Sequence, residues 1–83
     1  MEVYRRQFIH ALERLVSGYE QNGEFALALP YAQRWLALDP LDEAAARAVM
    51  RQLAGMGERS AAIRAYQACQ QTLQAELGIS PQA

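Results

Sequence analysis

Apolar residues recur along the chain at steps of three and four, the spacing that brings side chains to one face of an α-helix. Four segments show this pattern, and their apolar positions are Tyr4, Phe8, Leu12, Leu15, Val16 and Tyr19, then Phe25, Ala28, Leu29, Ala32, Trp35 and Leu36, then Ala46, Val49, Met50 and Leu53, and finally Ala62, Ile63, Tyr66, Cys69, Leu73 and Leu77. β-branched residues are few and nothing alternates with period two, so strands are not expected. We predict an all-α chain with helices near residues 2–20, 24–38, 41–55 and 58–77.

The second segment differs from the others because both of its sides are apolar. Leu27, Tyr31 and Leu38 add a further apolar side, so we expect this helix to be covered on two sides. It also contains Pro30, which removes a backbone hydrogen bond and costs about 3 kcal/mol in a straight helix. The apolar spacing continues across Pro30, which favours one kinked helix over two separate helices.

Short breaks separate the four segments. Gly23 and Gly57 are typical of tight helix–helix connections, because glycine adopts positive φ without steric cost. Asp39-Pro40 should end the second helix, since proline disfavours helical geometry in the residue before it. We predict that Asp39 also caps the third helix, with Pro40 in its first turn.

The charges and breaks near the other helix ends agree with this division. Asp42 and Glu43 place negative charge at the positive end of the third helix's dipole. In the closing "ELGISP", Gly78 should act as a left-handed cap, with Pro81 shortly after it.

The breaks and several core positions repeat after 34 residues. Gly23 and Gly57 are 34 apart, and so are Ala28 and Ala62. A 34-residue period with helix–turn–helix content is the tetratricopeptide signature. We therefore predict tetratricopeptide-like stacked helix hairpins, with one unit at 9–42, the next at 43–76, and a right-handed superhelical offset between them.

Residues 11–81 resemble the bacterial transcriptional activator domain, through "LALDPLDEAAARAVMRQLAGMGERSAAIRAY" and the closing "ELGISP". The resemblance implies that residues 1–83 are a single tetratricopeptide-like module, of the kind that follows a winged-helix domain in antibiotic-regulatory-type activators or sits in large multidomain regulators. Members generally extend further upstream and continue with another helix after the Ser-Pro. The resemblance thus implies a piece of a longer regulator.

Composition narrows the class of partner. The net charge is −1, with eight arginines and no lysine, whereas a nucleic-acid binder should concentrate basic residues on one face. We expect no direct nucleic-acid binding. Apolar runs stay short of the roughly 18 residues that a membrane helix needs, so we expect no membrane partner either. The single cysteine, Cys69, fits a reducing compartment, and we predict a cytoplasmic protein.

Residues with catalytic potential lack the neighbours that catalysis needs. His10 is the only histidine, so a metal site is not expected, and Cys69 on an apolar stripe is typical of a packing residue. Asp42 and Glu43 are interpreted as helix-start charges. We predict no enzymatic activity and no cofactor.

Two surfaces remain as candidates for binding. Stacked hairpins present the first helix of each pair on a concave face, which here should carry His10, Glu13, Ser17, Ala44, Arg47 and Arg51. That face could equally be ordinary solvated surface. We also expect weak self-association, as a two-fold homodimer, through the ends of the stack, meaning Tyr4 and Phe8 on the first helix or Leu73 and Leu77 on the last.

Two functions therefore remain open. The first is a non-catalytic protein–protein interaction module of a bacterial transcriptional regulator, which positions or dimerises neighbouring domains. The alternative is a generic tetratricopeptide scaffold that binds a peptide or partner helix and has no transcriptional role. Direct DNA binding through a helix–turn–helix is disfavoured by charge.

Overall fold

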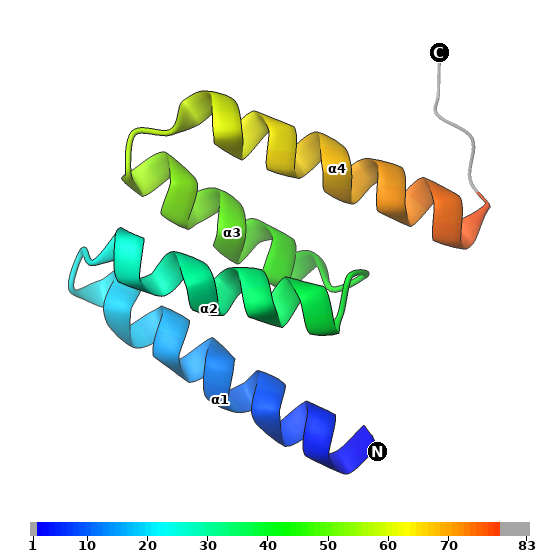
Figure 1. Ribbon diagram of the computed structural model, residues 1–83, viewed down its shortest axis with the longest axis horizontal. Helices are drawn as coiled ribbons and strands as arrows, with labels where there is room; N and C mark the ends of the chain where they lie inside the picture. Colours follow the sequence, from blue (N-terminus) through cyan, green and yellow to red (C-terminus); the bar gives the residue numbers. More distant parts are fainter. Residues whose placement is uncertain (1, 79–83) are drawn as a thin grey trace.

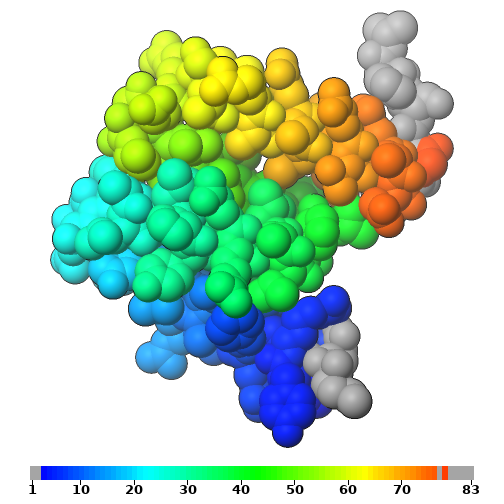
Figure 2. Space-filling model, in the orientation of Figure 1, coloured from blue at the N-terminus to red at the C-terminus, as the bar shows by residue number. Residues whose placement is uncertain are grey.

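The computed structural model describes residues 2–78, without the side chains of Glu2 and Leu77, and this part of the chain forms four helices (Figure 1). They are α1 (Glu2–Gln21), α2 (Phe25–Leu38), α3 (Glu43–Gly55) and α4 (Arg59–Leu77). Each helix packs against the next one along the chain, so α1 and α4 form the two outer ends of the stack, on opposite sides of the space-filling view (Figure 2). The predicted all-α class of stacked helix hairpins is confirmed.

The connections within the two hairpins repeat in detail. Gly23 and Gly57 both adopt positive φ, at 72° and 81°. The Glu24 N–H donates to the Tyr19 carbonyl over 2.9 Å, and the Glu58 N–H donates to the Leu53 carbonyl over 2.8 Å, again 34 residues further on. Gly78 also has positive φ and caps α4 as predicted, whereas Pro81 lies outside the described residues. The unit boundaries at 9–42 and 43–76 stay a prediction.

The start of α3 differs from the prediction. Asp42, not Asp39, is its N-cap, and one Asp42 carboxylate oxygen accepts a hydrogen bond of 2.9 Å from the Ala44 N–H. Asp39 instead ends α2, and its backbone carbonyl accepts a hydrogen bond from the Asp42 N–H, which closes a turn over residues 39–42. Pro40 lies in that turn, where its fixed φ favours a change of direction. The chain therefore needs three more residues to turn before an aspartate can satisfy the N–H groups of the next helix.

Pro30 lies inside α2, which stays one helix from Phe25 to Leu38, as predicted. Pro30 and Ala26, whose carbonyl would normally accept its missing bond, are both exposed. Water can therefore satisfy that carbonyl, which reduces the cost of the proline.

The core lies between the first three helices and consists mostly of small side chains. Its buried members are Leu12, Val16, Ala28, Ala32, Trp35, Ala45, Ala48 and Val49. α2 packs against both α1 and α3, and Tyr31 and Leu38 are partly buried, so its predicted cover on two sides is confirmed except at Leu27, which remains 50% exposed. α4, in contrast, contributes no fully buried residue to the part of the chain that the structure describes, and its Ile63 and Tyr66 side chains are exposed.

Replacing Ala28 with leucine should destabilise the fold, because Ala28 has no exposed surface between packed helices. Overpacking of this kind costs about 1–3 kcal/mol. Its counterpart Ala62 is only partly buried and lines an open hollow, so Ala62→Leu should cost less than about 1 kcal/mol. Urea unfolding of both variants, with exposed Gln70→Leu as a control, measures the difference; equal losses at both alanines would contradict this packing.

Candidate protein-binding surface

A small hollow of about 240 Å³ opens between α1 and α3, the first helices of the two hairpins. Its lining residues are Glu13, Val16, Ser17, Glu20, Trp35, Ala44, Arg47 and Arg51. Trp35 comes from α2 and is itself buried, with its indole N–H donating to an Asp42 carboxylate oxygen over 3.2 Å. The hollow therefore combines an aromatic wall held in place by α2 with polar groups from α1 and α3.

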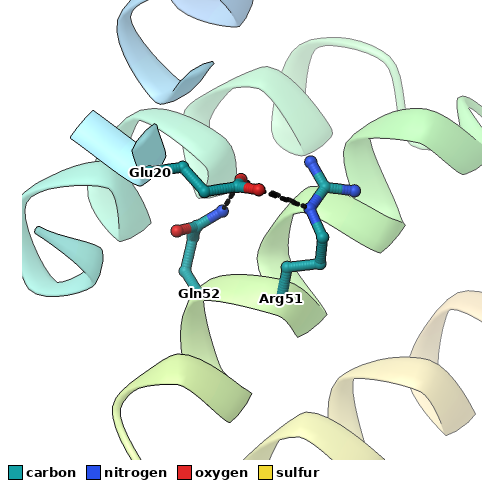
Figure 3. A network of polar contacts seen from close by, with 3 residues as sticks. All are labelled: Glu20, Arg51 and Gln52. Atoms are coloured by element: carbon teal, nitrogen blue, oxygen red, sulfur yellow. Dashed lines mark hydrogen bonds and ion pairs between the residues drawn. The ribbon is translucent and has the colours of Figure 1, made fainter. Parts of the chain in front are cut away.

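A polar network joins α1 to α3 at this hollow (Figure 3). Arg51 Nε donates to both carboxylate oxygens of Glu20, over 3.1 and 3.3 Å, and Gln52 Nε2 donates to one of them over 2.6 Å. Glu20 belongs to α1, while Arg51 and Gln52 are neighbours on α3. The network fixes the separation of the two helices because three charge-assisted bonds converge on one carboxylate.

The network also alters the ionisation of Glu20. Burial by itself raises the pKa of this carboxyl group. The hydrogen bonds from Gln52 and Arg51, together with the positive charge of Arg51, favour the ionised form and outweigh burial, so the pKa of Glu20 lies below its ordinary value of 4.5. Its stabilising contribution is then present above that ordinary value and is lost as pH falls through the lowered pKa.

Gln52 is the only fully buried polar side chain in the described part of the chain. Its Nε2 is bonded to Glu20, while its Oε1 has no hydrogen-bond partner among the described residues. A buried amide that loses its last partner costs about 1–3 kcal/mol, so Glu20 and Gln52 depend on each other.

Of the two arginines in the hollow, Arg47 makes the weaker contacts. It contacts Glu43 one turn earlier on α3 at 3.5 Å, and the two side chains are 58% and 71% exposed. Such an exposed pair contributes little and exchanges readily with water or another anion. Glu13 and Ser17 lie across the hollow on α1. A partner carboxylate could therefore replace Glu43 on Arg47 at small cost.

The structure brings together most, but not all, of the residues predicted for the concave face. Glu13, Ser17, Ala44, Arg47 and Arg51 line one hollow. His10 does not; it lines a separate hollow at the beginning of α1, and its Nδ1 lies 3.9 Å from a Glu13 oxygen.

Three residues that line the hollow were not predicted from the sequence as members of the site: Val16, Glu20 and Trp35. Glu20 follows Glu13 and Ser17 at steps of four and three, so the helical spacing alone could have placed it on the same face. Val16 and Trp35 were assigned to the apolar stripes of the first and second helices, and nothing in their spacing indicated that they would line this hollow.

The residues predicted for self-association lie at the two ends of the stack. Tyr4 and Phe8 on α1 are exposed, and the Arg34 guanidinium lies 5.4 Å from the centre of the Phe8 ring. Leu73 on α4 is partly buried, and the side chain of Leu77 lies outside the described residues. Whether these residues mediate self-association stays a prediction.

Groups that could support other chemistry are sparse. Within residues 2–78, no cluster of three or more histidine, cysteine, aspartate or glutamate side chains is arranged to hold a metal ion. Burial raises the pKa of the Cys69 thiol, which disfavours the reactive thiolate. In the same part of the chain, every helix is too short or too polar to cross a membrane.

Glu20→Ala should destabilise the stack by about 1–3 kcal/mol, because the buried Gln52 amide loses its acceptor and Arg51 loses its pair. The loss should be full at neutral pH and shrink as pH falls through the lowered pKa of Glu20. Urea unfolding at several pH values measures it. Glu13→Ala, on the same helix but exposed, should change stability by less than about 0.5 kcal/mol; similar losses for both would refute the network's structural role.

Comparison with known proteins supplies a family but no close relative. Neither a curated protein nor a solved structure matches the chain. A family model, the bacterial transcriptional activator domain, matches residues 1–83. The match covers the whole length over which the four helices and their 34-residue hydrogen-bond repeat occur. The chain belongs to the bacterial transcriptional activator domain family, a family of regulatory domains.

Proposed function

We propose that the chain is a non-catalytic protein-interaction module of a bacterial transcriptional regulator, which acts in the cytoplasm and positions neighbouring domains. Family membership supports the regulatory role. The hollow between α1 and α3 supports the interaction role for two reasons. One of its cations, Arg47, is held only by an exposed ion pair, and the two helices that form the frame of the hollow are joined by the Glu20 network. A rigid frame reduces the entropy lost on binding.

The partner that fits this hollow best is an acidic peptide or helix. Its carboxylate would contact Arg47, and a small apolar side chain would enter the hollow beside Val16 and Trp35, which are almost fully buried in its wall. Arg51 is less available, because it already pairs with Glu20. The specificity of the hollow then depends on one accessible cation facing Glu13.

Changes within the hollow should reduce activation by the full regulator. Ser17→Tyr fills the hollow and Arg47→Glu reverses its cation, and each should lower reporter transcription by roughly tenfold, corresponding to about 1.4 kcal/mol of lost contact. Gln33→Tyr and Arg64→Glu, exposed and outside the hollow, are the matched controls. Unchanged transcription in the first pair, at normal protein levels, would refute the assignment of this hollow.

A scaffold without a transcriptional role is the second candidate function. It would use the same surface, so the structure of the module does not separate the two. The full gene does: a winged-helix or ATPase domain in the same reading frame supports the regulator, and a gene with neither supports the scaffold.

The isolated chain should not bind duplex DNA. Its net charge is −1, Arg47 and Arg51 pair with Glu43 and Glu20, and Arg34 lies over Phe8. Fluorescence anisotropy with a labelled duplex at about 0.15 M salt should therefore show no measurable binding. A submicromolar dissociation constant with a steep salt dependence would contradict the proposed role and support direct DNA recognition.

A further inference from the structure

One side of α1 carries an apolar stripe that faces away from the core. Its members are Tyr4, Phe8, Ala11, Leu15 and Gly18, all of them exposed, with steps of four, three, four and three. This is the spacing by which a helix presents a ridge to a packing partner. Leu15 remains 42% exposed, and a Cβ added to Gly18 would meet nothing within 4 Å. We call these five residues the α1 ridge.

The 34-residue repeat shows what such a ridge does elsewhere in the same chain. Its counterparts are Leu38, the last residue of α2, Asp42, the N-cap of α3, and Ala45, Val49 and Gln52 on α3 itself. Of these, Ala45, Val49 and Gln52 are buried, with Ala45 and Val49 in the core that α1 and α2 form with α3. Gln52 reaches Glu20 on α1. The equivalent stripe is therefore the one by which α3 sits on the preceding hairpin.

The surface that receives α3 also has an open counterpart. Two adjoining hollows of about 490 and 330 Å³ lie between α3 and α4 and share Met50 and Tyr66. Subtracting 34 from their residues Met50, Ala62, Tyr66 and Cys69 gives Val16, Ala28, Ala32 and Trp35. All four of those residues are buried in the core beneath α3, whereas Ile63 and Tyr66 on α4 are 52% and 48% exposed. We call this surface the α3/α4 groove.

We propose that a second copy of this chain places its α1 ridge in the α3/α4 groove, so that copies stack head to tail. The contact continues the packing that already joins α3 to the α1/α2 hairpin, with the same helix type on the same hairpin type. The stacking rests on the proposed interaction role, because it names a second copy of the chain as one partner of the module. The ridge and the groove lie at opposite ends of the stack, as Figure 1 shows for α1 and α4, so one copy can use both at once.

Two features distinguish this arrangement from the two-fold dimer expected from the sequence. A two-fold dimer that used only one end of the stack would pair ridge with ridge or groove with groove, whereas the internal packing pairs a ridge with a groove. A heterologous contact also leaves a free ridge and a free groove after each addition, so growth does not stop at two copies. The two surfaces differ from the internal packing at three positions. Phe8 and Gly18 stand where α3 has Asp42 and Gln52. Arg14 stands where Ala48 is fully buried, and a long arginine can pack its stem and direct its charge to the edge of the contact.

The test blocks each surface separately and then mixes the variants. Leu15→Glu places a charge on the ridge and Ile63→Glu places one in the groove, while Gln33→Glu, at an exposed position of α2, is the control. Sedimentation of the 83-residue wild-type chain and of the control, at concentrations up to about 1 mM, should show masses that rise beyond two copies, as for a weak interface. Each blocked variant alone should stay at the monomer mass of 9.3 kDa. An equimolar mixture should form one-to-one pairs and nothing larger, because only one intact ridge and one intact groove remain.

Other outcomes would overturn the proposal. A wild type that stops at two copies, with only one of the two substitutions abolishing association, indicates a two-fold dimer. A wild type that stays monomeric refutes any self-association through these surfaces. Circular dichroism checks that the variants keep wild-type helix content, and Tyr66→Arg replaces Ile63→Glu if that variant unfolds. Ser17→Tyr lies outside both surfaces, so activation that depends on Ser17 in a monomeric chain would preserve the proposed function while rejecting the stacking.

Discussion

The close approach of α2 and α3 is the constraint on which the other contacts depend. The alanines that meet at the centre of the stack, Ala28, Ala32, Ala45 and Ala48, have no exposed surface. At the edge of the same contact, a Cβ added to Gly55 would lie only 2.6 Å from ring atoms of Phe25. Side chains this small leave no room for adjustment, so the separation of the two helices is set by their backbones. Trp35 occupies the space beside them, and its bond to Asp42 ties the end of α2 to the first turn of α3.

α1 shares the core with α3 through Leu12 and Val16, and outside that core the distance between the two helices is bridged by longer polar side chains. Glu20 spans that distance and meets Arg51 and Gln52, where an apolar pair would leave the buried Gln52 amide unsatisfied. The result is a polar hollow with a rigid frame between the first helices of the two hairpins. Arg47 stands one turn earlier on α3 with only an exposed partner, so the cation to which we assign binding and the carboxylate that joins the helices are different residues. A partner can therefore contact Arg47 without breaking the network that holds the frame.

Local rules in the sequence predict most of this architecture, because helix periodicity and glycine breaks depend on residues close in the chain, and the 34-residue repeat is the recurrence of these local patterns. The helix ends agree to within two residues, and α2 passes through Pro30 as expected. The cap of α3 was assigned to the wrong aspartate, because Asp39 and Asp42 satisfy the same local rule and only the path of the turn distinguishes them. The Glu20–Gln52 contact joins residues 32 positions apart. Periodicity gives the face of each residue but not which faces meet, so this contact and the place of Trp35 in the hollow could not be predicted.

Burial is distributed unevenly through the stack, and this affects how binding and stability are linked. α2 and α3 hold three and five buried residues, α1 holds Leu12 and Val16, and α4 holds none among those described. Elements with few buried contacts open at lower free energy than the rest of a domain. A partner helix that covered Ile63 and Tyr66 would add buried surface to α4, the helix that has least of it. Binding there would therefore stabilise α4 by mass action, so that occupancy of the groove and the rigidity of the outer hairpin rise together. In a regulatory module, such coupling would let a neighbour bound at one end of the stack raise the free energy needed to open that end.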